Sequence, residues 1–336
     1  MILDRSTLDL AQASVQIYLG RPPFNPVVGA RLGWFLEHVF GGDDKPDVFV
    51  TATARGEYET VSRNEFVWAE WDGQIVSGAW TISPVDDARI GSIGEVFTAE
   101  AYRGRGLARA VCQRLLQSFD ERGGQCMFLA TSNPTAELLY RQLGFEPLRG
   151  QLMRRTQTNF EDVWFRPSPV TMRPLVWGDL PRLIALYAVD TSWVSLCMMQ
   201  GFLSARWMLF TRANSFMKHT WQQTRQGLWL GLFNAEGALV GSCPAVPMGS
   251  EHQPLGGQID VFVHPSCSDH TPTLLRHTAQ AAQAKGWRWL IAWVASGDIE
   301  KRRFLAEAGF ELQTHIPEGI AVGDQVQPLE LWRWSL

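Results

Sequence analysis

The chain has 336 residues, of which 46% are hydrophobic and 19% charged, and its formal net charge is −4. This length favours two domains, and the composition excludes a disordered, collagen-like or low-complexity protein. We expect neither a nucleic-acid surface nor a membrane span, because the chain is not basic and no apolar run reaches about 18 residues.

Three sequence features indicate the cellular compartment and whether a metal site is expected. Residues 1–20 carry early acids and no basic region ahead of an apolar stretch, which is not typical of a secretory signal peptide. The five cysteines are odd in number and lack Cys-x-x-Cys spacing, which argues for a reducing compartment. His264, His270 and His277 lack acids at metal-ligand spacing. The sequence therefore predicts a cytoplasmic protein without a metal.

The sequence repeats itself at an offset of about 165 residues. Three well-separated places share this offset within one residue, which indicates two copies of one fold. The pairs are Glu95-Val96-Phe97 with Asp260-Val261-Phe262, Gly144-Phe145-Glu146 with Gly309-Phe310-Glu311, and the turn Asp72-Gly73 with Glu236-Gly237. We place the copies at residues 1–163 and 169–336, on either side of a proline-rich linker.

The first copy mixes helix and strand signals. Asp72-Gly73 predicts a hairpin turn, and a glycine-rich turn separates a strand from a helix. In chain order we expect a helical region at 7–40 broken by Pro22, Pro23 and Pro26, strands at 48–54, 66–71, 74–82 and 92–98, a helix at 106–121, a strand at 126–131, a helix at 134–142 and strands within 145–155.

The second copy opens with a short strand at 170–174 and a helix at 179–187, which has Asp179 at its cap and Pro181 in its first turn. We then expect strands at 227–233, 238–245 and 258–263, a helix at 272–284, a strand at 287–294, a helix at 299–308 and strands at 309–314 and 328–335. Helices and strands alternate in both copies, so the predicted fold class is α/β (α+β).

A glycine-rich turn at residues 103–108 joins a predicted strand to a predicted helix. The start of a helix exposes unpaired N–H groups and the positive end of its dipole, and glycines let the backbone approach an anion closely. Arg103 and Arg105 add positive charge. The turn predicts a phosphate or pyrophosphate site, and a glycine-rich turn with solvated arginines is the alternative. The P-loop and dinucleotide-binding fingerprints do not occur in the sequence.

Two segments of the first copy resemble the acyl-CoA motifs of the GNAT acetyltransferase superfamily. Arg103-Gly104-Arg105-Gly106-Leu107-Ala108 is similar to the pyrophosphate motif R/Q-x-x-G-x-G/A, and residues 130–145 resemble the family's second motif. The resemblance covers most of residues 45–155. It implies two tandem GNAT-type domains, each a mixed, mostly antiparallel sheet flanked by helices, with acetyl-CoA as the cosubstrate.

The resemblance also implies a role for each matching residue. Backbone N–H groups of residues 104–108 would hold the CoA pyrophosphate, and the backbone of Phe97 and Thr98 would pair with the pantetheine arm and polarise the thioester carbonyl. Asn133 would hydrogen-bond the pantetheine. Tyr140 would protonate the leaving thiolate, and a packed aromatic is the alternative. The residues expected to bind acetyl-CoA are Val96, Phe97, Thr98, Arg103, Gly104, Arg105, Gly106, Leu107, Ala108, Asn133 and Tyr140.

The same resemblance places a base and an acceptor near this site. Glu95 is the expected catalytic base, directly or through water, and a solvated or salt-bridged acid is the alternative. The expected acceptor is the amine of a small molecule. The candidate side chains for its pocket are Trp34, Phe35, Glu37, His38, Trp68, Trp71 and Trp80, although strand alternation would send some of them into the core.

The second copy lacks the residues of the phosphate turn. Asp269 would repel a pyrophosphate, and Pro272 removes a helix N–H donor. The counterparts at the repeat offset are Ser268 for Arg103, Asp269 for Gly104, Thr271 for Gly106, Thr273 for Ala108, Asp298 for Asn133 and Leu305 for Tyr140. We therefore predict a degenerate GNAT domain without CoA. The bulky apolar segment 193–221 fits either packing or a lipophilic acceptor pocket.

Three functions are compatible with these residues. The leading one is an acetyl-CoA-dependent acetyltransferase that has one working site and acts on the amine of a small molecule. The second is an acyl-CoA-binding or partner-binding scaffold without turnover. The third is acetylation of protein N-termini or lysines.

Overall fold

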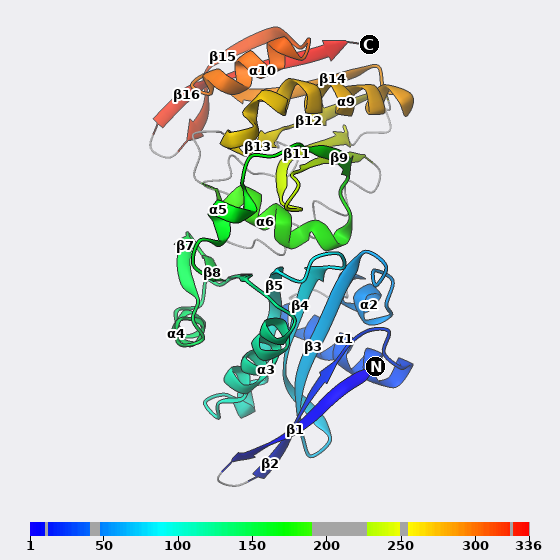
Figure 1. Cartoon of the computed structure of the whole chain (residues 1–336), viewed down its shortest axis with the longest axis vertical. Helices are drawn as coiled ribbons and strands as arrows, with labels where there is room; N and C mark the ends of the chain where they lie inside the picture. Colours follow the sequence, from blue (N-terminus) through cyan, green and yellow to red (C-terminus); the bar gives the residue numbers. More distant parts are fainter. Residues whose placement is uncertain (11–12, 41–47, 190–226, 249–254, 323–324, 336) are drawn as a thin grey trace. The chain divides into compact units, whose positions relative to one another are not determined.

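The computed structural model describes residues 1–10, 13–40, 48–189, 227–248, 255–322 and 325–335. The chain divides into two compact units (Figure 1). Each unit has a mostly antiparallel sheet flanked by helices, which confirms the predicted mixed α/β fold class. The first unit comprises Met1–Pro147, Met153–Thr158 and Val176–Pro181, and the second comprises Leu148–Leu152, Asn159–Leu175 and Arg182–Leu336.

The first sheet has eight strands, and helices stand between them in the chain. The elements are β1 (Ile2–Leu10), β2 (Ala13–Gly20), α1 (Pro26–Phe40), α2 (Val48–Ala54), β3 (Ser62–Trp71), β4 (Gln74–Pro84), β5 (Ile90–Thr98), η1 (Glu100–Tyr102), α3 (Leu107–Glu121), β6 (Cys126–Ala130), α4 (Pro134–Gln142), β7 (Glu146–Arg149) and β8 (Leu152–Thr156). The strand order is β1-β2-β3-β4-β5-β6-β8-β7. Strands β1 to β5 pair antiparallel, and β5 and β6 are parallel.

The N-terminal segment is a strand hairpin, so the helix predicted from residue 7 is wrong as far as residue 20. Val15, Ile17 and Leu19 are buried, and the residues between them are less so. This alternation is that of a strand with one face in the core. The helical prediction is correct only for α1.

The strand predicted at 48–54 is also wrong, because this segment forms helix α2. Ala52, Thr53 and Ala54 are all buried, so burial does not alternate as in a half-buried strand. Packing of α2 against α1 overrides the strand propensity of its β-branched residues.

The other predicted elements of the first copy are confirmed, although β3 begins at Ser62 rather than at residue 66. Asp72 and Gly73 join β3 to β4 with φ values of 47° and 75°. Positive φ at both positions is what a two-residue hairpin turn requires.

Helix α3 lies along one face of the first sheet (Figure 1) and fixes where its own N-terminus lies. Leu107, Val111 and Leu115 recur every four residues and are buried in one cluster with residues of β2, β3 and β4. A second row that includes Cys112 packs in another cluster with Tyr140. Burial of each Leu or Val stabilises the fold by about 1.5–3 kcal/mol, so the two rows hold the start of α3 in place.

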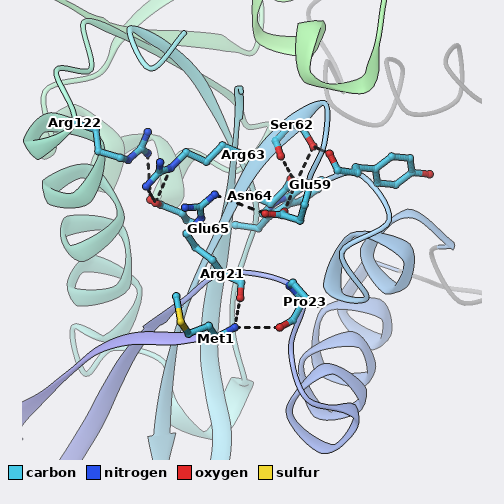
Figure 2. A network of polar contacts seen from close by, with 11 residues as sticks. Met1, Arg21, Pro23, Glu59, Ser62, Arg63, Asn64, Glu65 and Arg122 are labelled. Atoms are coloured by element: carbon cyan, nitrogen blue, oxygen red, sulfur yellow. Dashed lines mark hydrogen bonds and ion pairs between the residues drawn. The ribbon is translucent and has the colours of Figure 1, made fainter. Parts of the chain in front are cut away.

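A buried ion-pair network fastens the end of α3 to β3 (Figure 2). Glu65 is 1% exposed, and its carboxylate accepts hydrogen bonds from Ser118 Oγ (2.9 Å), Arg122 (3.1 Å) and Arg63 (3.1 Å). Burial alone would raise the pKa of Glu65, but Arg122, the Ser118 hydroxyl and Arg63 outweigh it and hold the pKa below its ordinary value. The charged carboxylate therefore contributes to stability at neutral pH.

Replacing Glu65 should destabilise the first unit. Glu65→Ala leaves Arg63 and Arg122 without their carboxylate, and we expect the free energy of unfolding to fall by about 3 kcal/mol in guanidinium chloride titrations. Because the folded-state pKa is depressed, the wild-type contribution should be complete above the unfolded pKa of about 4.3 and be lost as the pH falls through the folded value. Glu121→Ala, at an exposed acid of α3, should change stability by less than about 0.5 kcal/mol. Equal losses in the two variants would contradict the role of Glu65.

The second sheet follows with its own helices. The elements are α5 (Phe160–Trp164), β9 (Thr171–Pro174), η2 (Trp177–Asp179), α6 (Leu180–Ala188), β10 (Leu228–Phe233), β11 (Leu239–Pro247), β12 (Gly256–Ile259), β13 (Phe262–Val263), η3 (Pro265–His270), α9 (Thr271–Ala284), β14 (Trp289–Ala295), α10 (Ile299–Glu307), β15 (Glu311–Val322) and β16 (Gln325–Ser335). The strand order is β15-β16-β14-β12-β11-β10-β9, with β13 paired to β11. Strands β12 and β14 are parallel. The elements predicted for the described part of this copy are confirmed, except that the one strand predicted at 258–263 is divided into β12 and β13.

A short segment beyond the proline-rich linker belongs to the first unit. Trp177 is buried, and its ring centroid lies 5.7 Å from that of Tyr58. A Cβ added to Gly178 would lie 1.9 Å from the carbonyl oxygen of Val61, so the backbone passes too close for any side chain. The first unit thus includes residues 176–181, which lie beyond the predicted start of the second copy at residue 169. No helix within the described ranges is long and apolar enough to cross a membrane.

Candidate functional site

Strands β5 and β6 separate at one end of the first sheet. Their parallel ladder ends at the pair Ser92↔Phe128. Strand β5 continues to Thr98, and its register with β4 shifts by one residue after Gly94. Glu95 lies in this bulge with a φ of 54°, which few residues other than glycine adopt. A bulge bends its strand, and the end of the ladder leaves room between β5 and β6.

A pocket of about 580 Å³ lies beside this end of β5. Its walls come from β5, the turn before α3, the first turn of α3, and α4. The structure brings together every residue predicted to bind acetyl-CoA except Arg105. The lining residues are Val96, Phe97, Thr98, Tyr102, Arg103, Gly104, Gly106, Leu107, Ala108, Arg109, Asn133, Thr135, Ala136, Leu139 and Tyr140.

The turn before α3 and the first turn of this helix line the pocket. Gly104 and Gly106 have φ values of 74° and 81°, in the left-handed region that glycine enters without penalty. Gly106 is the N-cap of α3, and no side chain caps this helix start. The N–H groups of residues 107–109 have no acceptor within the helix. Together with the positive end of the helix dipole, they form a site suited to an anion.

The two arginines of the turn point to different places. Arg103 donates from Nε to the carbonyl oxygen of Thr98 (3.1 Å), and its Cζ lies 5.7 Å from the ring centroid of Phe97. Its guanidinium therefore stays at the pocket wall. Arg105 lies outside the lining, with its Cζ 5.0 Å from the ring centroid of Trp71. Arg105 thus braces the turn against the end of β3, and its contact with a cosubstrate stays a prediction.

Asn133 positions α4 as well as lining the pocket. Its Oδ1 accepts from the N–H groups of Thr135 (2.9 Å) and Ala136 (3.4 Å), so it is the N-cap of the helix. With Oδ1 engaged in this way, Nδ2 is the group that could donate to a ligand carbonyl.

Tyr140 is a buried phenol at the pocket wall. It is 6% exposed and packs in one cluster with Cys112 and Phe145. Burial, with a smaller effect of Cys112, raises the pKa of Tyr140 well above its ordinary value. The hydroxyl therefore keeps its proton at neutral and mildly alkaline pH, as a proton donor must. The structure is thus compatible with both interpretations of Tyr140, a packed aromatic and a proton donor.

Burial also raises the pKa of the Cys112 thiol to about 12. This thiol is fully buried against Tyr140 and stays protonated. Cys112 therefore contributes packing rather than a nucleophile.

Glu95 stands at the β5 bulge, directly before the lining residue Val96. Its own side chain is partly exposed and is not among the lining residues. The role of Glu95 as a base, directly or through water, therefore stays a prediction.

The tryptophans predicted for an acceptor pocket divide between the core and the surface. Trp68 and Trp80 are buried, and Trp80 stacks on Phe66 at 5.9 Å between ring centroids. Trp71 packs against Tyr102 at 5.4 Å between ring centroids and is not among the lining residues.

Helix α1 contributes one aromatic contact to the pocket wall. The ring of Phe35 lies 5.4 Å from that of Phe97, while Trp34 is 62% exposed. The side chains of Glu37 and His38 and the segment 193–221 lie outside the described residues.

Five lining residues were not predicted: Tyr102, Arg109, Thr135, Ala136 and Leu139. Asn133, Ala136 and Tyr140 recur at helical spacing, and this signal could have identified Ala136. Arg109 stands in the first turn of α3 and donates to the side chain of Gln142. Its positive charge beside the glycine turn is the sequence signal that could have identified it as a pocket residue. No three His, Cys, Asp or Glu side chains of the described ranges come together as a metal site.

A family comparison bears directly on this pocket. Residues 37–145 match the model of the acetyltransferase (GNAT) family. This segment is a GNAT acetyltransferase domain. The domain contains the glycine turn, Asn133 and Tyr140, so the family match and the pocket coincide. No curated protein matches the chain.

Several solved structures are similar to about half of this chain. A GNAT superfamily phosphinothricin acetyltransferase from Sinorhizobium meliloti, in complex with acetyl-CoA, is 15% identical, covers 50% of this chain and 88% of its own, and has a TM-score of 0.42. A GNAT family acetyltransferase from Streptococcus pneumoniae is 14% identical, with coverages of 50% and 99% and a TM-score of 0.42. A ribosomal-protein-alanine N-acetyltransferase from Brucella melitensis is 18% identical, with coverages of 49% and 99% and a TM-score of 0.39.

Proposed function

We propose that the first unit transfers an acetyl group from acetyl-CoA to the amine of a small molecule, by direct attack in a ternary complex. The main support is that one pocket carries the uncapped helix start, the Asn133 amide and the Tyr140 hydroxyl together. The GNAT match over residues 37–145 supports acetyl transfer in general.

Cosubstrate binding would use backbone groups more than side chains. The N–H groups of residues 104–109 and the positive end of α3 would hold the pyrophosphate. The edge of β5 at residues 96–98, freed by the separation from β6, would pair with the pantetheine arm as an added strand pairs with a sheet edge. Asn133 Nδ2 would donate to a pantetheine carbonyl.

The chemistry then needs few groups, because a thioester is already activated. A backbone N–H of Phe97 or Thr98 would polarise the thioester carbonyl. The C–N bond forms and the C–S bond breaks. Before attack, one proton of the substrate ammonium would pass through water to Glu95, which leaves the neutral amine as the nucleophile. The Tyr140 hydroxyl would give its proton to the leaving thiolate, and the second proton lost by the nitrogen would restore the neutral phenol.

We further propose that the second unit is a copy of the same fold that has lost its acyl-CoA site. The ladder pair Gly78↔Phe97 recurs as Ser242↔Phe262, and the parallel pair β5–β6 recurs as β12–β14. The 3₁₀ helix η3 stands where the first unit has its glycine turn, and Pro272 occupies the first turn of α9. A proline there supplies no N–H donor.

Calorimetric titration of acetyl-CoA into the full-length protein tests both proposals. We expect one site per chain. Thiol release in the presence of a panel of small amines then measures turnover. Two sites per chain would contradict the loss of the second site, and binding without thiol release for any amine would favour the scaffold. No binding at all would overturn the acetyltransferase proposal.

A further inference from the structure

The second unit contains a buried ion pair between Lys301 and Asp260. The side chains are 0% and 3% exposed, and Lys301 Nζ contacts Asp260 Oδ1 directly. Lys301 lies in the first turn of α10, and Asp260 directly follows β12. Lysine is almost never buried so completely unless a partner compensates its charge.

Lys301 occupies the position in the second unit that Ala136 occupies in the first. Helix α4 is capped by Asn133, whose Oδ1 accepts from the N–H of Ala136 (3.4 Å). Helix α10 is capped by Asp298, whose Oδ1 accepts from the N–H of Lys301 (3.1 Å). The two helices therefore place the two side chains equivalently along their first turns.

Asp260 contributes the carboxylate of this pair from the end of strand β12. It directly precedes Val261, as Glu95 directly precedes Val96. Strand β11 pairs with β12 and β13 in one register, without the one-residue shift that marks β5. The second unit has thus lost the bulge, and Asp260 contacts Lys301 of α10 instead.

We infer that Lys301 fills the cleft of the second unit at the point where Ala136 leaves the cleft of the first unit open. This inference rests on the proposed function of the first unit. Ala136 lines the pocket, and its side chain ends at Cβ, whereas a lysine at the equivalent place reaches across to the strand. The residue at this helical position therefore decides whether the cleft admits the pantetheine arm. Asp260 offsets the cost of burying the ammonium.

Introducing a long side chain at residue 136 of the first unit tests this inference. Ala136→Lys and Ala136→Met in the full-length protein should each lower acetyl-CoA affinity at least about 100-fold by calorimetry, which corresponds to about 2.7 kcal/mol. The methionine variant separates filling of space from charge. Leu138→Lys is the matched control, because Leu138 lies on the same helix, is 62% exposed and does not line the pocket. It should keep wild-type affinity. Wild-type affinity in Ala136→Met would overturn the inference.

A second set of variants tests the ion pair itself and needs no acetyl-CoA. Lys301→Met and Asp260→Asn should each lower the thermal unfolding midpoint of the full chain by several degrees, and the double variant should recover part of the loss. A Lys301→Met protein that melts like the wild type would contradict the proposed pair. If the wild type binds no acetyl-CoA, the proposed function fails, and these melting measurements still decide whether the pair of Lys301 and Asp260 stabilises the second unit.

Discussion

Gly106→Val should lower the affinity for acetyl-CoA about 100-fold or more. Valine cannot adopt the φ of 81° at the N-cap of α3 without strain, so the N–H groups of the following turn change direction. Loss of two hydrogen bonds to a charged phosphate, at about 1.5 kcal/mol each, gives about 3 kcal/mol. Calorimetric titration of the variant and the wild type measures the difference.

Gly123 provides a matched control at the other end of the same helix. It has a φ of 82°, and a Cβ there would meet no atom within 4 Å, as at Gly106. Gly123→Val should therefore lower stability to a similar degree and leave acetyl-CoA affinity unchanged. Equal losses of affinity in the two variants would mean that strain in α3, rather than the anion site, explains the effect.

Tyr140→Phe should lower kcat about 10²–10⁴-fold with little change in acetyl-CoA affinity. The variant removes the proton donor but keeps the ring that packs beside Cys112 and Phe145, and general acid catalysis contributes about this much. Thiol release measures kcat, and calorimetry measures binding. An unchanged kcat would leave Tyr140 with packing as its only role.

The pH dependence of kcat adds a second readout for Tyr140. Because burial raises its pKa well above the ordinary value near 10, the phenol should not lose its proton below about pH 10. The alkaline side of the wild-type profile should therefore stay flat up to that pH. Tyr102→Phe is the control, since Tyr102 also lines the pocket but packs against Trp71. It should keep the wild-type kcat and profile.

The glycine turn and the α4 cap could be predicted from the sequence because short stretches of chain determine them. Gly104 and Gly106 have positive φ values, which glycine adopts without penalty, and Asn133 before a proline is a strong helix-start signal. Both features depend on neighbours only a few residues away.

The N-terminal hairpin, α2 and the direction of Arg105 could not be predicted in the same way. Packing against distant residues decides each of them. Segment 48–54 has strand propensity and becomes a helix against α1. Arg105 belongs to a motif that suggests phosphate binding, yet Trp71, far away in the sequence, takes up its guanidinium.

The burial of Lys301 could not be predicted from the sequence either. The proposed repeat indicates which residues of the second unit differ from the acyl-CoA motif, but an ordinary lysine on a polar helix gives no sign of burial. Its environment appears only when α10 and the strand that precedes Asp260 come together.

The inclusion of Val176–Pro181 in the first unit has a practical consequence for dissecting the chain. A fragment that ended in the proline-rich linker would lack Trp177 and Gly178, and would leave Tyr58 and the Val61 carbonyl uncovered. A fragment intended to carry the proposed acetyl-CoA site alone should therefore extend at least to Pro181. The two halves then overlap in sequence, because the same residues lead directly into α6. No single cut within Val176–Pro181 therefore yields two fragments that each keep all of their own residues.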